Sequence, residues 1–269
     1  MSNVEVIGTN IMQEIFKIMG QLRDPKSGCP WDLKQNFKSI VPHTIEEAYE
    51  VADCIERQAY DDLPGELGDL LFQVVFYAQL GKEEGYFEFK DIVEKLSRKL
   101  KERHPHVFGD VTAGDLAEQN NRWEDHKARE RELASDGRHK SELDGVPIGL
   151  PALTRATKLQ KRASRVGFDW PDTTGVQEKV SEEFSEVVAA IAEGSRSQIE
   201  QEMGDLLFAC VNWMRHFDLD PETALRKANR KFEQRFHFIE ASLESLGSSV
   251  RGASLARMDE LWEAAKSVE

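Results

Sequence analysis

Apolar residues recur every three to four positions through most of the 269-residue chain, which is the spacing of one face of an α-helix. Alternating runs of β-branched residues, which mark strands, are few. We therefore expect an all-α protein. The pattern predicts helices at about 8–23, 44–58, 63–84, 88–103, 115–133, 151–165, 174–193, 197–216, 221–246 and 253–267. Helix breakers separate them in RDPKSGCP (23–30), HPHVFGD (104–110), DGVPIGLP (144–151) and DWPDT (169–173).

The acidic residues of the chain repeat at a fixed interval. Five of them recur as the same residue type 136 positions later, and the block ELGDLLF likewise returns as EMGDLLF. The pairs are Glu46 with Glu182, Glu47 with Glu183, Glu50 with Glu186, Glu66 with Glu202, and Asp69 with Asp205. Five acidic positions in one register indicate a tandem duplication of a helical module.

The stretch from about 111 to 147 is polar, carries charges of both signs and has few apolar anchors. Such a composition predicts a connecting helix followed by a linker. We place the first module, with its connecting helix, at 1–135, the linker at 136–150 and the second module at 151–269.

The acidic residues fall at helical spacing. Glu183 and Glu186 share one helix face, as do Glu202 and Asp205 on the next helix. If the two helices pack antiparallel across EGSRSQ (193–198), the four carboxylates can face each other. Like charges at close range raise one another's pKa values and destabilise the pair unless cations lie between them. One interpretation is a solvated acidic face; the duplicated spacing on apolar flanks favours a hard divalent cation such as magnesium.

A ferritin-like di-iron site is a rival, but such a site pairs glutamate with histidine three residues later. Neither acidic cluster has a histidine at that spacing, so magnesium is favoured over iron. Basic residues at helical spacing could hold a phosphate chain, or could simply balance nearby glutamates. They are Lys179, the pair Lys99 and Arg103, and the pair Lys231 and Arg235. Trp31, Trp170 and Trp262 could stack on a base, although a packing role is favoured for each.

Composition limits the partners. A formal net charge of −14 argues against nucleic acid and anionic membranes, because both need a basic surface. Cys29, Cys54 and Cys210 are too scattered for a disulfide framework and suit reduced thiols. The start MSNVEVIGTN lacks the features of a signal peptide, and the most apolar stretch, LLFQVVFYAQL (70–80), is too short to span a bilayer. We expect a soluble cytoplasmic protein.

The repeated EExxE and ExxD blocks, together with CPWD, KERHPHVF and LPALTRATKLQKRASRVGFDW, resemble the all-α nucleoside triphosphate pyrophosphohydrolases of the MazG type, including the two-module bacterial members. The likeness covers nearly the whole chain. It implies hydrolysis of (deoxy)nucleoside triphosphates to the monophosphate and pyrophosphate. It also implies a Mg²⁺ cofactor, with Mn²⁺ as a substitute, and a homodimer whose helices form a four-helix-bundle-like core.

Carried onto matching positions, the resemblance implies metal ligands at Glu183, Glu186, Glu202 and Asp205, and a second such site at Glu47, Glu50, Glu66 and Asp69. Glu182 would assist the attacking water or bind an additional metal. The implied nucleotide contacts are Lys179, Lys231, Arg235 and Trp262, with Asn212 added as a substrate contact. A basic residue that some members carry ahead of the second acidic cluster is Gln198 here.

The two modules differ at positions near the carboxylates. Phe76 and His43 of the first module stand where the second has Asn212 and Lys179. An apolar ring on the acidic face hinders a hydrated nucleotide, so the second module is the expected main catalytic site. There, a water activated by metal would attack the α-phosphorus, while Lys231 and Arg235 stabilise the departing pyrophosphate. The alternative is a non-catalytic acidic helical module for dimerisation or interaction.

Overall fold

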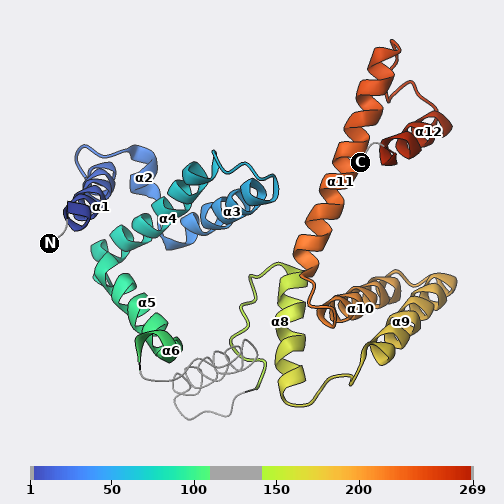
Figure 1. Ribbon diagram of the computed structural model, residues 1–269, viewed down its shortest axis with the longest axis horizontal. Helices are drawn as coiled ribbons and strands as arrows, with labels where there is room; N and C mark the ends of the chain where they lie inside the picture. Colours follow the sequence, from blue (N-terminus) through green and yellow to red (C-terminus); the bar gives the residue numbers. More distant parts are fainter. Residues whose placement is uncertain (1–2, 110–140, 268–269) are drawn as a thin grey trace. The chain divides into compact units, whose positions relative to one another are not determined.

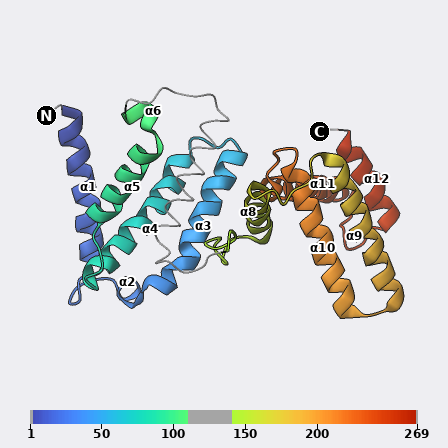
Figure 2. The ribbon, with the colours of Figure 1, turned by 90° about the horizontal axis from the view of Figure 1, so that it is seen from below.

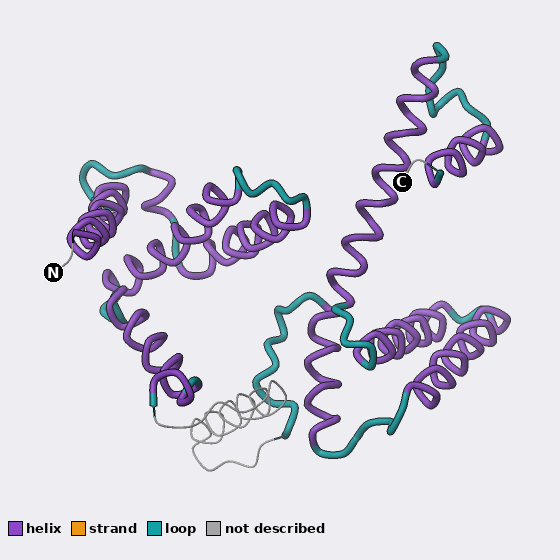
Figure 3. The backbone as a smooth tube through the Cα atoms, viewed as in Figure 1, coloured by secondary structure: helices purple, strands orange, loops and turns teal. Residues whose placement is uncertain are grey.

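The computed structural model describes residues 3–109 and 141–267, with side chains described from residue 11. It divides into two compact units, Met1–Glu130 and Arg131–Glu269. Every described element is a helix, joined to the next by loops, and the described ranges contain no strand (Figure 3). The all-α prediction is therefore confirmed. The predicted helix at 115–133 and the start of the predicted linker lie outside the described residues, so the predicted module limits stay predictions.

The first unit is built around one antiparallel helix pair. Its helices are α1 (Asn3–Leu22), α2 (Pro30–Lys34), α3 (Phe37–Glu56), α4 (Leu63–Glu83), α5 (Phe89–Arg103) and α6 (Pro105–Phe108). α3 and α4 lie side by side, and α1 packs against α4 (Figures 1 and 2). The core between these helices contains Met19, Ile40, Val75, Phe76 and Leu80, all almost fully buried.

The second unit repeats this plan. Its helices are α8 (Ala152–Arg165), α9 (Thr173–Glu193), α10 (Arg196–Arg215), α11 (Pro221–Ser245) and α12 (Leu255–Lys266). α9 and α10 form the pair that corresponds to α3 and α4, and α8 packs against α10 as α1 does against α4 (Figure 1). α11 and α12 pack on each other around Ile239, Leu243 and Leu261.

Capping residues explain where the paired helices begin. Asn36 accepts hydrogen bonds from the backbone N–H groups of Lys38 and Ser39, and Ser39 closes the capping box. α3 therefore begins at Phe37, seven residues before the predicted start, and Pro42 lies inside it. α2 was not predicted; it begins at Pro30, a residue that suits the first turn of a helix.

Among the described residues, we find no helix that combines the length and the apolar character needed to cross a membrane.

Candidate active site

A tight turn brings the two acidic segments of the second unit opposite each other. α9 ends at Gly194, whose φ of 75° is a left-handed conformation that glycine adopts without strain. Ser195 then caps α10 by accepting a hydrogen bond from the backbone N–H of Gln198. Because so few residues separate the helices, α9 and α10 run antiparallel side by side (Figure 2). The ExxE segment of α9 therefore approaches the ExxD segment of α10.

Three carboxylates of this pair converge. One oxygen from each of Glu183, Glu186 and Glu202 lies within 4.8 Å of the others, and Glu183 is only 6% exposed. Burial, followed by the charges of Glu183 and Glu202, raises the pKa of Glu186. Oxygen donors crowded in this way suit a hard divalent cation. The donor set therefore fits a divalent metal, and the predicted convergence holds for these three residues.

Lys179 forms ion pairs with this cluster. Its ammonium lies 2.9 Å from a carboxylate oxygen of Glu182 and 2.7 Å from one of Glu183, one turn along α9. Hydrogen bonds to Glu183 and Glu182 raise the pKa of Lys179 well above its ordinary value. One ammonium cannot balance four nearby glutamates, so the cluster keeps a net negative charge that a divalent cation would offset.

A cavity of about 420 Å³ opens beside the cluster. Most of its lining is apolar, from Leu159, Val176 and Phe208 among others. Its polar lining includes Gln160, Lys179, Glu183, Asp205, Asn212 and Arg215. Asp205 is thus on the wall of the same cavity as Glu183, although it does not join the three carboxylates that lie mutually within 4.8 Å.

The end of the cavity near Asn212 carries an ion pair that the sequence did not reveal. The Arg215 guanidinium contacts the Asp169 carboxylate, and its Nε donates to Oδ1 of Asn212 at 2.8 Å. His216 Nε2 also lies 3.1 Å from Asp169. Burial opposes ionisation of Asp169, but the hydrogen bond and charge of Arg215 lower its pKa overall. The sequence signal, two polar residues one turn apart on α10, is weak, and Asp169 is distant in the chain.

Trp170 also lines this cavity, and a glycine holds it in place. A Cβ added at Gly175 would lie 2.3 Å from Cδ1 of Trp170, so only glycine lets the indole pack against the start of α9. The packing role favoured for Trp170 is therefore observed, and the same ring shapes the cavity wall.

The remaining predicted substrate contacts lie elsewhere in the second unit. Lys231 and Arg235 are on α11 and Trp262 is on α12. The Arg235 guanidinium lies 5.2 Å from the ring centroid of Trp262, beside the α11–α12 core. None of these three residues lines the cavity of the same chain.

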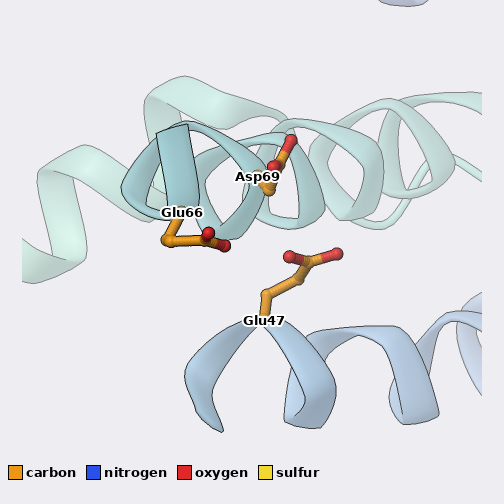
Figure 4. Close-up of side chains that lie close together, drawn as sticks. All are labelled: Glu47, Glu66 and Asp69. Carbon is orange, nitrogen blue, oxygen red and sulfur yellow. The ribbon is translucent and has the colours of Figure 1, made fainter. Parts of the chain in front are cut away.

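The first unit also brings three of its four predicted metal ligands together, but not all of them are the equivalents of the three that meet in the second unit. Glu47 on α3 points toward Glu66 and Asp69 on α4, and one oxygen from each lies within 4.8 Å of the others (Figure 4). Glu50 is outside this group. Burial, followed by a hydrogen bond and charge from Glu50, raises the pKa of Glu47. In each predicted set of four metal ligands, three residues therefore lie close together.

The position of Asn212 is apolar in the first unit. Phe76 is fully buried there and packs in the core with Met19 and Ile40. The Arg23 guanidinium lies 5.3 Å from its ring centroid and pairs with Glu83 instead of an amide. At this position the first unit therefore has a buried aromatic ring, where the second unit has the polar side chain of Asn212 in its cavity wall.

Comparison with known proteins identifies the family. The sequence model of the MazG nucleotide pyrophosphohydrolase domain matches residues 35–108 and again 173–237. A nucleoside triphosphate pyrophosphohydrolase of Escherichia coli K12 is 50% identical over 262 residues, which are 97% of this chain and 98% of that protein. The nucleoside triphosphate pyrophosphohydrolase/pyrophosphatase MazG of Thermotoga maritima is 44% identical over 95% of this chain and 96% of its own length. The chain therefore belongs to the MazG nucleotide pyrophosphohydrolase family and carries two copies of its domain, which confirms the resemblance and the duplication predicted from the sequence.

Proposed function

We propose that the chain hydrolyses (deoxy)nucleoside triphosphates to the monophosphate and pyrophosphate, with magnesium, at the second unit. The names of the relatives from Escherichia coli and Thermotoga maritima support the reaction. The observation that supports the location is the continuity of the carboxylate cluster with the cavity, since Glu183 belongs to both.

Glu183, Glu186 and Glu202 would hold the cation, with Asp205 as a further ligand from the cavity wall. Bound magnesium would polarise the phosphates and would lower the pKa of a bound water, so that this water can give up a proton as it attacks phosphorus. Glu182 is exposed and shares the Lys179 ammonium with Glu183 of the cluster. Its carboxylate would therefore be available to take a proton from the attacking water. Lys179 would turn its ammonium from the glutamates toward the incoming triphosphate. The same residues would accept Mn²⁺ as a substitute for magnesium.

We further propose a homodimer. α9 and α10 expose large apolar side chains beside the acidic cluster: Phe184, Val188, Ile191, Met203, Leu207 and Phe208. In a single chain Leu207 is 60% exposed. A contiguous exposed apolar face is typical of an interface. A second copy would cover this face, and its Lys231, Arg235 and Trp262 would then be candidates for completing the substrate site.

Product analysis tests the reaction directly. The full-length protein is incubated with each deoxynucleoside triphosphate and magnesium, and pyrophosphate and orthophosphate are quantified separately. We expect a monophosphate and pyrophosphate in equal amounts. We also expect Asp205→Asn to lower the rate at least about 100-fold while the circular dichroism spectrum is kept. Release of orthophosphate first would contradict the proposed reaction. If no triphosphate is hydrolysed and magnesium leaves the melting temperature (Tm) unchanged, the non-catalytic interaction module is the better account.

A further inference from the structure

Two buried side-chain amides line the cavity of the second unit. Asn212 is 6% exposed and Gln160 is 8% exposed, in a lining that is otherwise largely apolar. Buried amides normally use both their donors and their acceptor, because an unpaired polar group costs free energy. Among the described residues, each of these two amides has a hydrogen-bond partner at one end only.

The orientation of the Asn212 amide is fixed by its neighbour. Arg215 Nε donates to Oδ1 of Asn212 at 2.8 Å. A guanidinium has donors only, so the amide atom that faces it must be the oxygen. The Nδ2 group then faces away from Arg215, and the described part of the chain offers it no hydrogen-bond acceptor. Asn212 therefore presents a donor to a ligand.

Gln160 is fixed in the opposite sense. Its Nε2 donates to the backbone carbonyl of Phe208 at 2.8 Å. A carbonyl can only accept, so the amide nitrogen must be the atom that faces Phe208. Oε1 is left buried, and no donor within the described ranges reaches it. Gln160 therefore presents an acceptor.

The charge at this end of the cavity is balanced. The Asp169 carboxylate pairs with the Arg215 guanidinium, so the Asn212 amide sits beside a neutral pair. Lys179, Glu183 and Asp205 carry the charge of the cavity. On α10, seven residues separate Asp205 from Asn212, which is about 10 Å at the rise of an α-helix. A triphosphate held at the acidic end would thus place its uncharged nucleoside near the two amides.

We propose that this cavity takes the nucleoside of the substrate and recognises it through a fixed donor, Nδ2 of Asn212, and a fixed acceptor, Oε1 of Gln160, with Arg215 as the positioning residue for Asn212. The ligand class is a nucleoside that offers one acceptor and one donor, as the edge of a nucleobase does. This inference rests on the proposed function. The first unit has Phe76 and Gln79 at the positions of Asn212 and Arg215, so the arrangement belongs to the second unit alone.

Steady-state kinetics on the full-length protein tests this recognition. KM and kcat for pyrophosphate release are measured with dATP, dGTP, dCTP and dTTP for Asn212→Asp, Gln160→Met and Arg215→Met. We expect KM for the preferred triphosphate to rise about 10- to 100-fold, because a polar group loses its partner in a buried site, while kcat changes about threefold or less. The preference among the four triphosphates should shrink toward unity.

A double variant tests the positioning role. If Arg215 acts through Asn212, then Arg215→Met added to Asn212→Ala should raise KM by less than about twofold further, although Arg215→Met alone raises it clearly. Additive effects would contradict the positioning role.

Two controls separate the nucleoside end from the rest of the site. Inorganic tripolyphosphate, a probe without a nucleoside, should inhibit the wild type and the three single variants with the same inhibition constant within about twofold. Arg23→Met removes a guanidinium that is paired with Glu83 in the first unit and should leave KM unchanged. If the wild type releases no pyrophosphate, the proposed function itself fails. If pyrophosphate is released but Asn212→Asp and Arg215→Met leave KM and the nucleotide preference unchanged, the proposed recognition is wrong. It is also wrong if these variants raise the inhibition constant of tripolyphosphate as much as they raise KM.

Discussion

Glu183 is the most buried carboxylate of the second unit's cluster, and it is held by Lys179 at 2.7 Å. Glu186 is exposed, and no residue in the described ranges forms a comparable ion pair with it, so it bears the repulsion of Glu183 and Glu202. A crowded carboxylate of this kind lowers the free energy of unfolding unless a bound cation neutralises the charge. Binding of the proposed cation would therefore be coupled to folding at this residue.

Replacing Glu186 by glutamine should stabilise the protein when divalent cations are removed. Burial and the charges of Glu183 and Glu202 raise the folded-state pKa of Glu186, so its ionised form weakens folding as pH rises through that pKa. In EDTA at pH 7.5 we expect Glu186→Gln to melt at a higher temperature than the wild type, and the gain to fade as pH drops through the raised pKa. Differential scanning fluorimetry measures this.

The control for that experiment is Glu178→Gln, an exposed glutamate on the same helix outside the cluster, which should leave Tm unchanged. Magnesium should reverse the order by raising Tm more in the wild type than in Glu186→Gln. A lower Tm for Glu186→Gln in EDTA would show that the carboxylates do not repel each other in the folded chain.

Gly175→Ala should damage the cavity wall. The new Cβ would overlap the ring of Trp170, so the indole or the start of α9 must move. Overpacking of this kind costs about 1–3 kcal/mol, which urea unfolding can measure. Gly20→Ala is the control, since a Cβ there meets nothing within 4 Å and alanine favours the helix by up to about 1 kcal/mol. An unchanged unfolding free energy for Gly175→Ala would mean that Trp170 is not held as described.

The acidic residues could be predicted from the sequence because the duplication repeats them at a constant interval of 136 positions. The sequence did not predict Gln160, Asp169 or Arg215. Their roles depend on a loop and two helices that meet only in the folded chain, and no repeat marks them. Asn212 was found through its contrast with Phe76, but the orientation of its amide needed the position of Arg215.

At the scale of elements, the pairs α3–α4 and α9–α10 explain why the acidic spacing works. In each pair a short connection lets the two helices pack side by side, and in the second pair Ser195 caps the start of α10. Acidic residues spaced three apart can then meet across the pair, as Glu183 and Glu186 of α9 meet Glu202 of α10. The helical periodicity predicted these elements well, and most ends agree within a few residues. The start of α3 differed because its capping box at Asn36 outweighs the proline at 42.

The exposed apolar face of α9 and α10 should mediate the proposed homodimer. Leu207→Glu places a charge on that face, and we expect it to convert dimers to monomers in sedimentation velocity at micromolar concentration, because burying an unpaired charge is costly. Ile148→Glu, at an apolar residue that is 86% exposed in a loop, should leave the mass unchanged. A monomeric wild type, or a dimeric Leu207→Glu, would contradict an interface on this face.

At the scale of the whole molecule, the two units share a plan but differ in what stands beside their carboxylates. The second has a cavity with Lys179 and Asn212 in its wall, and the first has His43 and the buried ring of Phe76 at those positions. Duplication therefore accounts for both acidic clusters, while divergence around them assigns the proposed catalysis to one.

The measurement that tests this claim most directly is the rate of magnesium-dependent pyrophosphate release from deoxynucleoside triphosphates by Glu183→Gln and Glu47→Gln, two matched changes at equivalent positions of the repeat. We expect Glu183→Gln to lose at least about 99% of the wild-type rate, because it removes a buried carboxylate that is the proposed metal ligand beside the cavity. Glu47→Gln should keep most of that rate. Equal losses, or a larger loss in Glu47→Gln, would contradict the assignment of catalysis to the second unit.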